Sequence, residues 1–282
     1  MSELALTGPG ARARLRPDRG ARVQHLVDAA SGRELFWQGP TAEAWPRDEY
    51  MAGVAGGWDN VFPNDHPWGD YPDHGRVWSS PFEVVSSAAT EATLRTELAS
   101  PGVEIVQRYS LLGDGRRGLR QETTLSARSA TGPFLWSSHP MLAVEPGWRI
   151  ELPPTEIRTD PEYSGRLPRG AVLPPEQQEE ALAVEPHESS FELRFAQGVR
   201  EAAVASPDGA RRTRLAWDGS FLEHLWIVTI SGFPPVDLAL QLETSSSHTF
   251  DLGGAIESGT AASLEAGEER TFWVEIESLD RT

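Results

Sequence analysis

Two side chains far apart in the sequence are suited to moving protons, and the first of them is His139. It follows the largely apolar segment 134–138 and directly precedes Pro140. Histidine is the side chain best suited to proton transfer near neutral pH. Because a proline ends ladder pairing, we expect His139 at the end of a strand, where it can point into the mouth of a sandwich. A hydrogen-bonded structural histidine is the alternative interpretation.

The second candidate is Glu243, which follows an alternating apolar and polar segment at residues 236–242. Successive side chains of a strand point to opposite faces, so the leucines of this segment should share one face, and Gln241 and Glu243 the other. A carboxylate beside an amide suits the recognition of hydroxyl groups. The alternative is an ordinary solvated strand face.

A third feature is the stretch Gly56–Trp78, which holds three of the ten Trp and two of the seven His. Its glycines and prolines indicate a shaped loop, and tryptophan offers flat apolar faces with one polar edge. We expect one wall of a binding cleft, with His74 in it and with Asp73 either orienting the His74 ring or ending the turn. A Trp-rich loop that plugs the end of a β-sandwich is the alternative.

Acidic and imidazole side chains in the same stretch raise the question of a metal site; they are Asp59, Asp65, His66, Asp70, Asp73 and His74. Their spacing matches no His-x-x-x-His or calcium-loop pattern, so we predict no metal. The sequence contains no glycine-rich phosphate loop and no Gly-x-Ser-x-Gly turn. The basic cluster at 211–214 could meet a phosphate, but the exposed face of a strand near a turn is the favoured interpretation.

The overall composition limits the partners. All 25 basic residues are Arg, and the net charge is −17. Nucleic acids and anionic membranes require a positive surface, so neither is predicted as a partner. The lack of cysteine excludes disulfides and thiol chemistry. The N-terminus has no apolar run typical of a signal peptide, and the apolar run Leu225–Ile230 is too short to span a bilayer. We therefore expect a cytoplasmic protein.

Short alternating segments separated by turn signals predict strands along most of the chain, from Leu4 to Glu277. Residues 39–80 show little periodicity and are expected to form a loop region. The best helical window, Pro175–Val184, lies in a Pro- and Glu-rich segment, 151–189, which we interpret as a surface excursion; an interdomain linker is the alternative. Such a pattern predicts an all-β fold with very little helix, a large antiparallel sandwich or barrel, with residues 1–282 in a single domain.

The chemistry-bearing elements resemble, in their order, the aldose 1-epimerase (galactose mutarotase-like) family. The resemblance rests on Gly56-Gly57-Trp58-Asp59, Phe62-Pro63 and Pro72-Asp73-His74-Gly75, followed by the elements around His139 and Glu243. Residues 23–37 and 262–273 are also similar, so nearly the whole chain is covered. The resemblance implies a large antiparallel β-sandwich that binds a monosaccharide in a cleft and acts without a cofactor.

It also implies individual roles. His139 would protonate the sugar ring oxygen, Glu243 would take the proton of the anomeric hydroxyl, and His74 would bind the sugar and polarise the ring oxygen. Trp58, Trp78 and Trp136 would supply an apolar platform for one face of the sugar. Asp218 would be the sugar-binding aspartate.

Four features depart from the pattern. Better-known members have Asn-His-x-His-Gly-Gly where this chain has Asp73-His74-Gly75, and they often have His-x-Tyr-Phe-Asn where this chain has His139-Pro140-Met141-Leu142. Related sequences commonly carry an acidic residue where Arg76 stands, and a proline where Thr244 follows the base. The acid–base pair is retained, but the substrate stays open. A same-fold enzyme for a phosphorylated sugar or a non-sugar metabolite, and a sugar-binding protein without turnover, are the alternatives. Arg76 is the position where an unusual substrate would be recognised.

Overall fold

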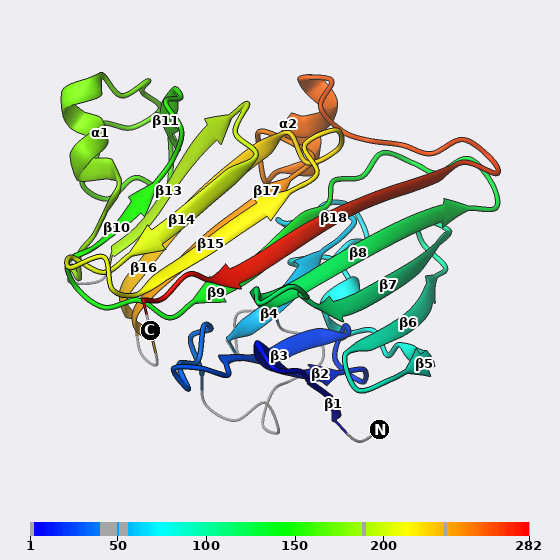
Figure 1. The fold of residues 1–282 in the computed structure, drawn as a ribbon. Coiled ribbons are helices and arrows are strands. Elements are labelled where there is room, and N and C mark those ends of the chain that lie inside the picture. The colour runs from blue at the N-terminus through cyan, green and yellow to red at the C-terminus, as the bar shows by residue number, and fades with distance from the viewer. Residues whose placement is uncertain (1–2, 40–49, 51–55, 188–189, 234–235, 282) are drawn as a thin grey trace.

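Two antiparallel sheets of nine strands each form the described part of the molecule (Figure 1). The structure is a computed structural model that describes residues 3–39, 50, 56–187, 190–233 and 236–281. Sheet 1 has the strand order β1-β2-β3-β4-β9-β17-β16-β13-β11, and sheet 2 has the order β12-β10-β14-β15-β18-β8-β7-β6-β5. The strands of sheet 1 are β1 (Leu4–Thr7), β2 (Ala11–Arg16), β3 (Arg22–Asp28), β4 (Gly57–Val61), β9 (Ser137–Leu142), β11 (Ile157–Thr159), β13 (Ser190–Gln197), β16 (His224–Phe233) and β17 (Val236–Ser245). The strands of sheet 2 are β5 (Glu83–Ser87), β6 (Glu91–Leu98), β7 (Val103–Leu111), β8 (Arg117–Ala127), β10 (Trp148–Glu151), β12 (Ala183–Val184), β14 (Glu201–Ala205), β15 (Arg212–Trp217) and β18 (Glu269–Ser278).

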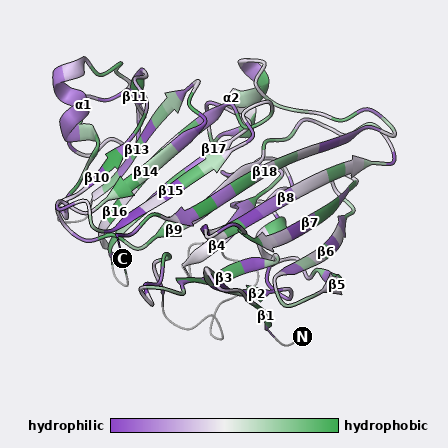
Figure 2. Cartoon of the chain, in the orientation of Figure 1, coloured by the Kyte–Doolittle hydropathy of each residue, from purple (hydrophilic) through white to green (hydrophobic). Residues whose placement is uncertain are grey.

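Alternating side chains build the core between the sheets. Along β7, buried apolar residues such as Val103 and Ile105 alternate with more exposed polar ones, and Figure 2 shows the two colours alternating along several strands. One apolar cluster takes side chains from both sheets, including Leu242 of β17 and Ile276 of β18. The described residues contain little helix, namely α1 (Pro175–Ala181), α2 (Leu252–Glu257) and the 3₁₀ turn η3 (Val77–Ser79). The prediction of a large antiparallel sandwich is confirmed.

Residues 39–80 do not form a continuous loop, and this prediction was wrong at Gly57–Val61. These five residues form β4, which pairs with β3 and β9 inside sheet 1. All five are buried. A strand covered on both faces has no reason to alternate, and its polar residues Asp59 and Asn60 resemble loop composition, so the sequence pattern concealed it. The neighbouring residues 40–49 and 51–55 lie outside the described residues.

The strand that carries His139 does not end before Pro140, which corrects a second expectation. Strand β9 runs on to Leu142, and its pairing with β4 is continuous through Trp58–Pro140. On the other side, the pairs with β17 skip His139 and Pro140. A proline lacks the N–H that a ladder needs, so the sheet accommodates it as a local gap in one ladder.

The segment 151–189 joins the two sheets at their edges. It supplies β11 to sheet 1 and β12 to sheet 2, with α1 between them inside the predicted helical window. Ile157, Leu167, Leu173 and Ala181 form a small apolar cluster of their own. Residues 188 and 189 lie outside the described part.

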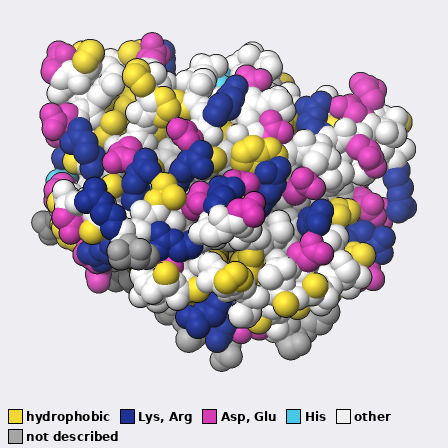
Figure 3. All heavy atoms as spheres, viewed as in Figure 1, with side chains coloured by type: hydrophobic (Ala, Val, Ile, Leu, Met, Phe, Trp, Pro, Cys, Tyr) yellow, Lys and Arg dark blue, Asp and Glu magenta, His cyan; other side chains and the backbone are white. Residues whose placement is uncertain are grey.

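The surface shown in Figure 3 mixes the two signs of charge, although the net charge is −17. Many of its arginines form ion pairs with neighbouring carboxylates. The three arginines of the basic cluster at 211–214 contact Glu145, Glu151 and Glu201, at 2.5, 2.7 and 2.6 Å respectively. Each of these arginines is therefore paired with a carboxylate at the surface, which agrees with the exposed face of a strand. In the described residues, no helix is long and apolar enough to cross a membrane.

Candidate active site

Three neighbouring strands of sheet 1, β4, β9 and β17, each present one titratable side chain on the face turned away from sheet 2. Asp59 is the direct cross-strand partner of His139. The pairs of β9 with β17 on both sides of His139 set a register that puts Glu243 beside it. The next residue of β17, Leu242, points the other way into the core. The side chains of Asp59, His139 and Glu243 are almost completely buried.

Both ring nitrogens of His139 have partners. Nδ1 lies 3.0 Å from Oδ1 of Asp59 and 3.0 Å from the hydroxyl of Tyr50. Nε2 lies 3.0 Å from the amide nitrogen of Gln241 and 3.5 Å from Oε1 of Glu243. These five residues are named the His139 cluster. An imidazole held between two carboxylates can carry a proton that one of them helps to transfer.

Arg22 of β3 completes the surroundings of Asp59. Its guanidinium is buried, pairs with Oδ2 of Asp59, and donates to the carbonyl of Gly56 at 2.6 Å. A buried charge requires a partner with good geometry, and here the arginine and the carboxylate satisfy each other.

His74 reaches the cluster from a tight turn. Its backbone φ is +59°, a conformation that costs energy for a residue with a side chain. The turn passes so close to β4 that a Cβ on Gly75 would lie 2.1 Å from the carbonyl oxygen of Phe62. The His74 ring stacks on Tyr50 with 3.6 Å between ring centroids, and it stands perpendicular to the His139 ring at 5.6 Å.

Acidic residues of the same turn surround His74. Asp73 lies 3.1 Å from its Nδ1, and Asp65 lies 3.9 Å from its Nε2. Asp65 also lies 3.1 Å from Nδ1 of His66, whose pKa is raised chiefly by that hydrogen bond. Asn64 keeps the turn closed by donating to the carbonyls of His66 and Pro72. Among the described residues, no group of three His, Asp or Glu side chains is arranged to hold a metal ion.

Burial and charge raise the pKa values of both the acid and the base above their ordinary values. Burial opposes the charge on His139, but Glu243 and Asp59 outweigh it and raise its pKa to about 9. Burial raises the pKa of Glu243 to about 7, against the opposing effect of His139. Burial also acts to raise the pKa of Asp59, but Arg22 and His139 reverse this and lower it. Near neutral pH the site therefore holds an imidazolium, a fixed carboxylate and a carboxyl group that titrates.

Known structures share this architecture. The chain matches a protein of Synechocystis sp. PCC 6803, Slr1438, at 19% identity and a TM-score of 0.74 over 99% of this chain and 96% of the other. It matches a protein of Escherichia coli K12 that is provisionally called an aldose 1-epimerase at 14% identity and a TM-score of 0.73, over 99% of each chain. A galactose mutarotase-like protein of Clostridium acetobutylicum matches at 14% and 0.70, over 98% of this chain and 95% of the other. The chain has the galactose mutarotase-like fold.

At such identities the likeness establishes the fold, and the site residues have to be judged by their geometry. No family model matches the sequence, and no curated protein is similar to it. Two cavities that described residues line lie away from this site. One cavity of about 450 Å³ lies beside Arg12, Arg14, His25 and Val27, and another of about 480 Å³ lies beside Trp148. Neither contains a residue of the His139 cluster, so the titratable groups define the candidate site.

On this galactose mutarotase-like framework, several residues expected from the sequence come together. His139, Glu243 and Gln241 are in direct contact, and His74 lies against the cluster with Asp73 behind it. The face of β17 that holds Gln241 and Glu243 is buried, so the interpretation as an ordinary solvated face was wrong.

Other expected residues lie elsewhere. Trp58 and Trp136 belong to the apolar core between the sheets, so their rings form no platform beside His139. Asp218 follows β15 in sheet 2, where its carboxylate accepts the N–H of Ser220. Trp78 is buried with its ring against Tyr50, and it donates to the carbonyl of Gly75. Arg76 is exposed and donates to the carbonyl of Asp70.

Three residues of the site were not identified from the sequence as part of the chemistry. Asp59 was counted only among the acidic residues that raised the metal question, because the strand around it was interpreted as loop. Arg22 and Tyr50 have no motif of their own. The signal that could have found Asp59 is its position next to Trp58, since a buried tryptophan in a strand places its neighbour on the opposite face.

Proposed function

We propose that this protein is an aldose 1-epimerase that interconverts the α and β anomers of a neutral monosaccharide. The observation that carries the proposal is the His139–Glu243 pair, an imidazolium and a carboxyl group 3.5 Å apart with pKa values of about 9 and 7. Mutarotation requires one proton to leave O1 and one to reach the ring oxygen. Both oxygens are bonded to C1, so the acid and the base must be close neighbours, as they are here.

In the ring-opening step, the Glu243 carboxylate takes the proton from O1 while Nε2 of His139 gives its proton to the ring oxygen. The bond between C1 and the ring oxygen breaks, and an open-chain aldehyde forms. At this point His139 is neutral and Glu243 is a carboxylic acid.

Rotation about the C1–C2 bond presents the other face of the aldehyde. In the closing step, Nε2 of His139 takes back the proton of the ring hydroxyl as its oxygen attacks C1. Glu243 returns its proton to O1. Each group ends in its starting state, so the cycle consumes no co-reactant. General acid–base catalysis of this type typically contributes about 10²–10⁴-fold to the rate.

Two further features support the proposal. The fold is shared with a protein of E. coli that is provisionally called an aldose 1-epimerase. Sugar binding alone does not require a buried acid beside a buried base, since burying titratable groups costs stability unless they are well paired.

The direct test follows the optical rotation of freshly dissolved α-glucose and α-galactose. We expect the protein to accelerate equilibration well above the buffer rate, and His139→Gln to abolish the acceleration. If neither sugar equilibrates faster than in buffer, the neutral-aldose proposal fails. A panel of other fresh anomers, with glucose 6-phosphate among them, then shows whether a phosphorylated sugar is the substrate.

A further inference from the structure

Asp59 lies behind His139, at the ring nitrogen that faces away from Glu243, and its two oxygens have separate partners. Oδ1 lies 3.0 Å from Nδ1 of His139, and Oδ2 accepts from the buried guanidinium of Arg22. Arg22 is itself tied to the carbonyl of Gly56 at the start of β4. The carboxylate is therefore fixed from both ends, and His139 is the side chain it can orient.

This contact determines which nitrogen of His139 moves a proton. An ionised carboxylate can only accept hydrogen bonds, so Nδ1 must carry the hydrogen that points at Asp59. Nε2 is left as the nitrogen that gains and loses a proton, and it faces Glu243 and Gln241. When His139 is protonated, its Nε2–H needs an acceptor, which Gln241 supplies by turning its amide oxygen toward the ring. When His139 is neutral, the amide nitrogen of Gln241 can donate to Nε2.

The charges around His139 also differ in kind. Among the described residues, Asp59 of β4, Glu243 and Gln241 of β17, Tyr50 and His74 lie against it. The charge of Asp65 also acts on it. Glu243 gains and loses a proton during the proposed cycle. Asp59 does not, because Arg22 keeps it ionised. A nearby negative charge favours the protonated form of an imidazole. The charge of Asp59 persists through the cycle, so it helps His139 to take up its proton again.

We propose that Asp59, held by Arg22, is a positioning residue for His139 that fixes the Nδ1–H tautomer and presents Nε2 as the proton-carrying atom. The orienting role stands on the contacts alone. Only the statement that this atom meets a sugar rests on the proposed function.

The test is the Asp59→Asn variant, observed by NMR of the protein with ¹⁵N-labelled histidine. Arg22 can only donate, so the new amide must turn its oxygen to Arg22 and its NH₂ group to Nδ1. His139 then has to move its neutral-state proton to Nε2. We expect the nitrogen shifts of His139 to report this exchange of tautomers, and its pKa to fall by about 1–3 units when the adjacent charge is lost. The His139 signals are identified by their absence from His139→Gln.

The matched control is Glu34→Gln, which alters a second carboxylate–imidazole contact at 2.8 Å, between Glu34 and His25 on β3. Glu34 also accepts the N–H groups of Leu26 and Phe36, which a glutamine oxygen can still do. This control should leave the tautomer and the pKa of His139 unchanged. Circular dichroism first shows that Asp59→Asn is folded, because unfolding alone would also return the pKa of His139 toward 6.5. An unchanged tautomer and pKa of His139 in folded Asp59→Asn would overturn the proposal.

A kinetic arm separates this inference from the proposed function. If the protein is a mutarotase, Asp59→Asn should lower kcat at least about 10²-fold, and the alkaline limb of its pH profile should move to lower pH. A lower kcat with an unmoved alkaline limb would contradict the positioning role. If no sugar is turned over by the native protein, the proposed function fails, and the NMR titration still decides the role of Asp59.

Discussion

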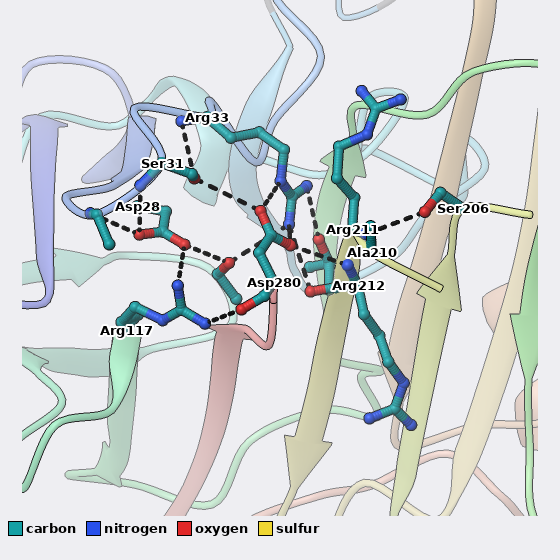
Figure 4. A network of polar contacts seen from close by, with 12 residues as sticks. Asp28, Ser31, Arg33, Arg117, Ser206, Ala210, Arg211, Arg212 and Asp280 are labelled. Carbon is teal, nitrogen blue, oxygen red and sulfur yellow. Dashed lines mark hydrogen bonds and ion pairs between the residues drawn. The ribbon is translucent and has the colours of Figure 1, made fainter. Parts of the chain in front are cut away.

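Two regions of this molecule place buried carboxylates beside cationic side chains, and they differ in whether the cation is a permanent one or one that titrates. The first, named here the sheet clasp, consists of Asp28, Arg33, Arg117 and Asp280 and joins the two sheets (Figure 4). Arg33 makes two hydrogen bonds of 2.7 Å to the carboxylate of Asp280. Arg117 of sheet 2 lies 3.1 Å from Asp28 of sheet 1. The second region is the His139 cluster.

The pKa values show the difference. Burial acts to raise the pKa of Asp28 and of Asp280, but hydrogen bonds, from Ser278 to the first and from Arg33 to the second, reverse this and lower both. In the His139 cluster, burial raises the pKa of Glu243 to about 7, and the cation that opposes this most strongly is His139, a side chain that itself titrates. A carboxylate paired with a permanent cation stays ionised and serves a structural role. A carboxylate whose partner can itself titrate is available for proton transfer.

The largest expected effect comes from removing the base of the cluster with Glu243→Gln. Its kcat for mutarotation should fall about 10²–10⁴-fold, because the amide cannot take the O1 proton, while sugar binding measured by calorimetry persists. The free energy of unfolding at pH 8 should not fall, since a poorly paired buried carboxylate is removed. The control is Glu201→Gln, an exposed partner of Arg214 on sheet 2, which should change neither quantity. Retained turnover in Glu243→Gln would exclude the proposed base.

Disrupting the clasp with Asp28→Asn should produce the opposite result. Asp28 is fully buried against Arg117 and accepts from Ser278 at 2.6 Å. Removing one partner of a buried pair typically costs about 3–5 kcal/mol, so urea unfolding should show a loss toward the lower end of that range, because an asparagine keeps some hydrogen bonds. The turnover of the folded protein should be unchanged. Glu91→Gln, at an exposed pair with Arg108, is the control and should cost less than about 1 kcal/mol. A loss of turnover in folded Asp28→Asn would show that the two regions are coupled.

The same contrast explains what the sequence could predict. The strands with one buried face, such as β7, alternate clearly, and the leucines of β17 placed Gln241 and Glu243 on the opposite face correctly. His139 and His74 were found because their residue types fit the chemistry and their contexts fit a family pattern. Asp59 and Arg22 were not, because β4 is buried on both faces and lacks alternation, and because an ion pair between β3 and β4 depends on a register that no local pattern encodes. The Trp residues misled, since Trp58 and Trp136 fill the core.

The pH dependence of activity gives a third comparison. The base must be ionised, which requires a pH above the pKa of Glu243 at about 7, and the acid must be protonated, which requires a pH below the pKa of His139 at about 9. We expect kcat/KM to be highest between these values and to fall about tenfold per pH unit on each side, with the two limbs belonging to the coupled pair. Asp28→Asn should leave both limbs in place. A profile that is flat from pH 5 to 10 would contradict the proposed acid and base.

The smallest expected effect is a difference in how the free energy of unfolding of the two regions depends on pH. The pKa values of Asp28 and Asp280 are lower in the folded state than the ordinary 3.8, so their contribution is present above that value and is lost as the pH falls through the lower folded values. The pKa of His139 is raised from 6.5 to about 9, so its contribution is complete below pH 6.5 and is lost as the pH rises through 9. Relative to the native protein, Asp28→Asn should therefore flatten only the acid limb of the unfolding free energy, and His139→Gln only the alkaline limb. Urea unfolding across pH 3–10 measures both, and a variant that flattens the opposite limb would show that its charge is partnered differently from the contacts described.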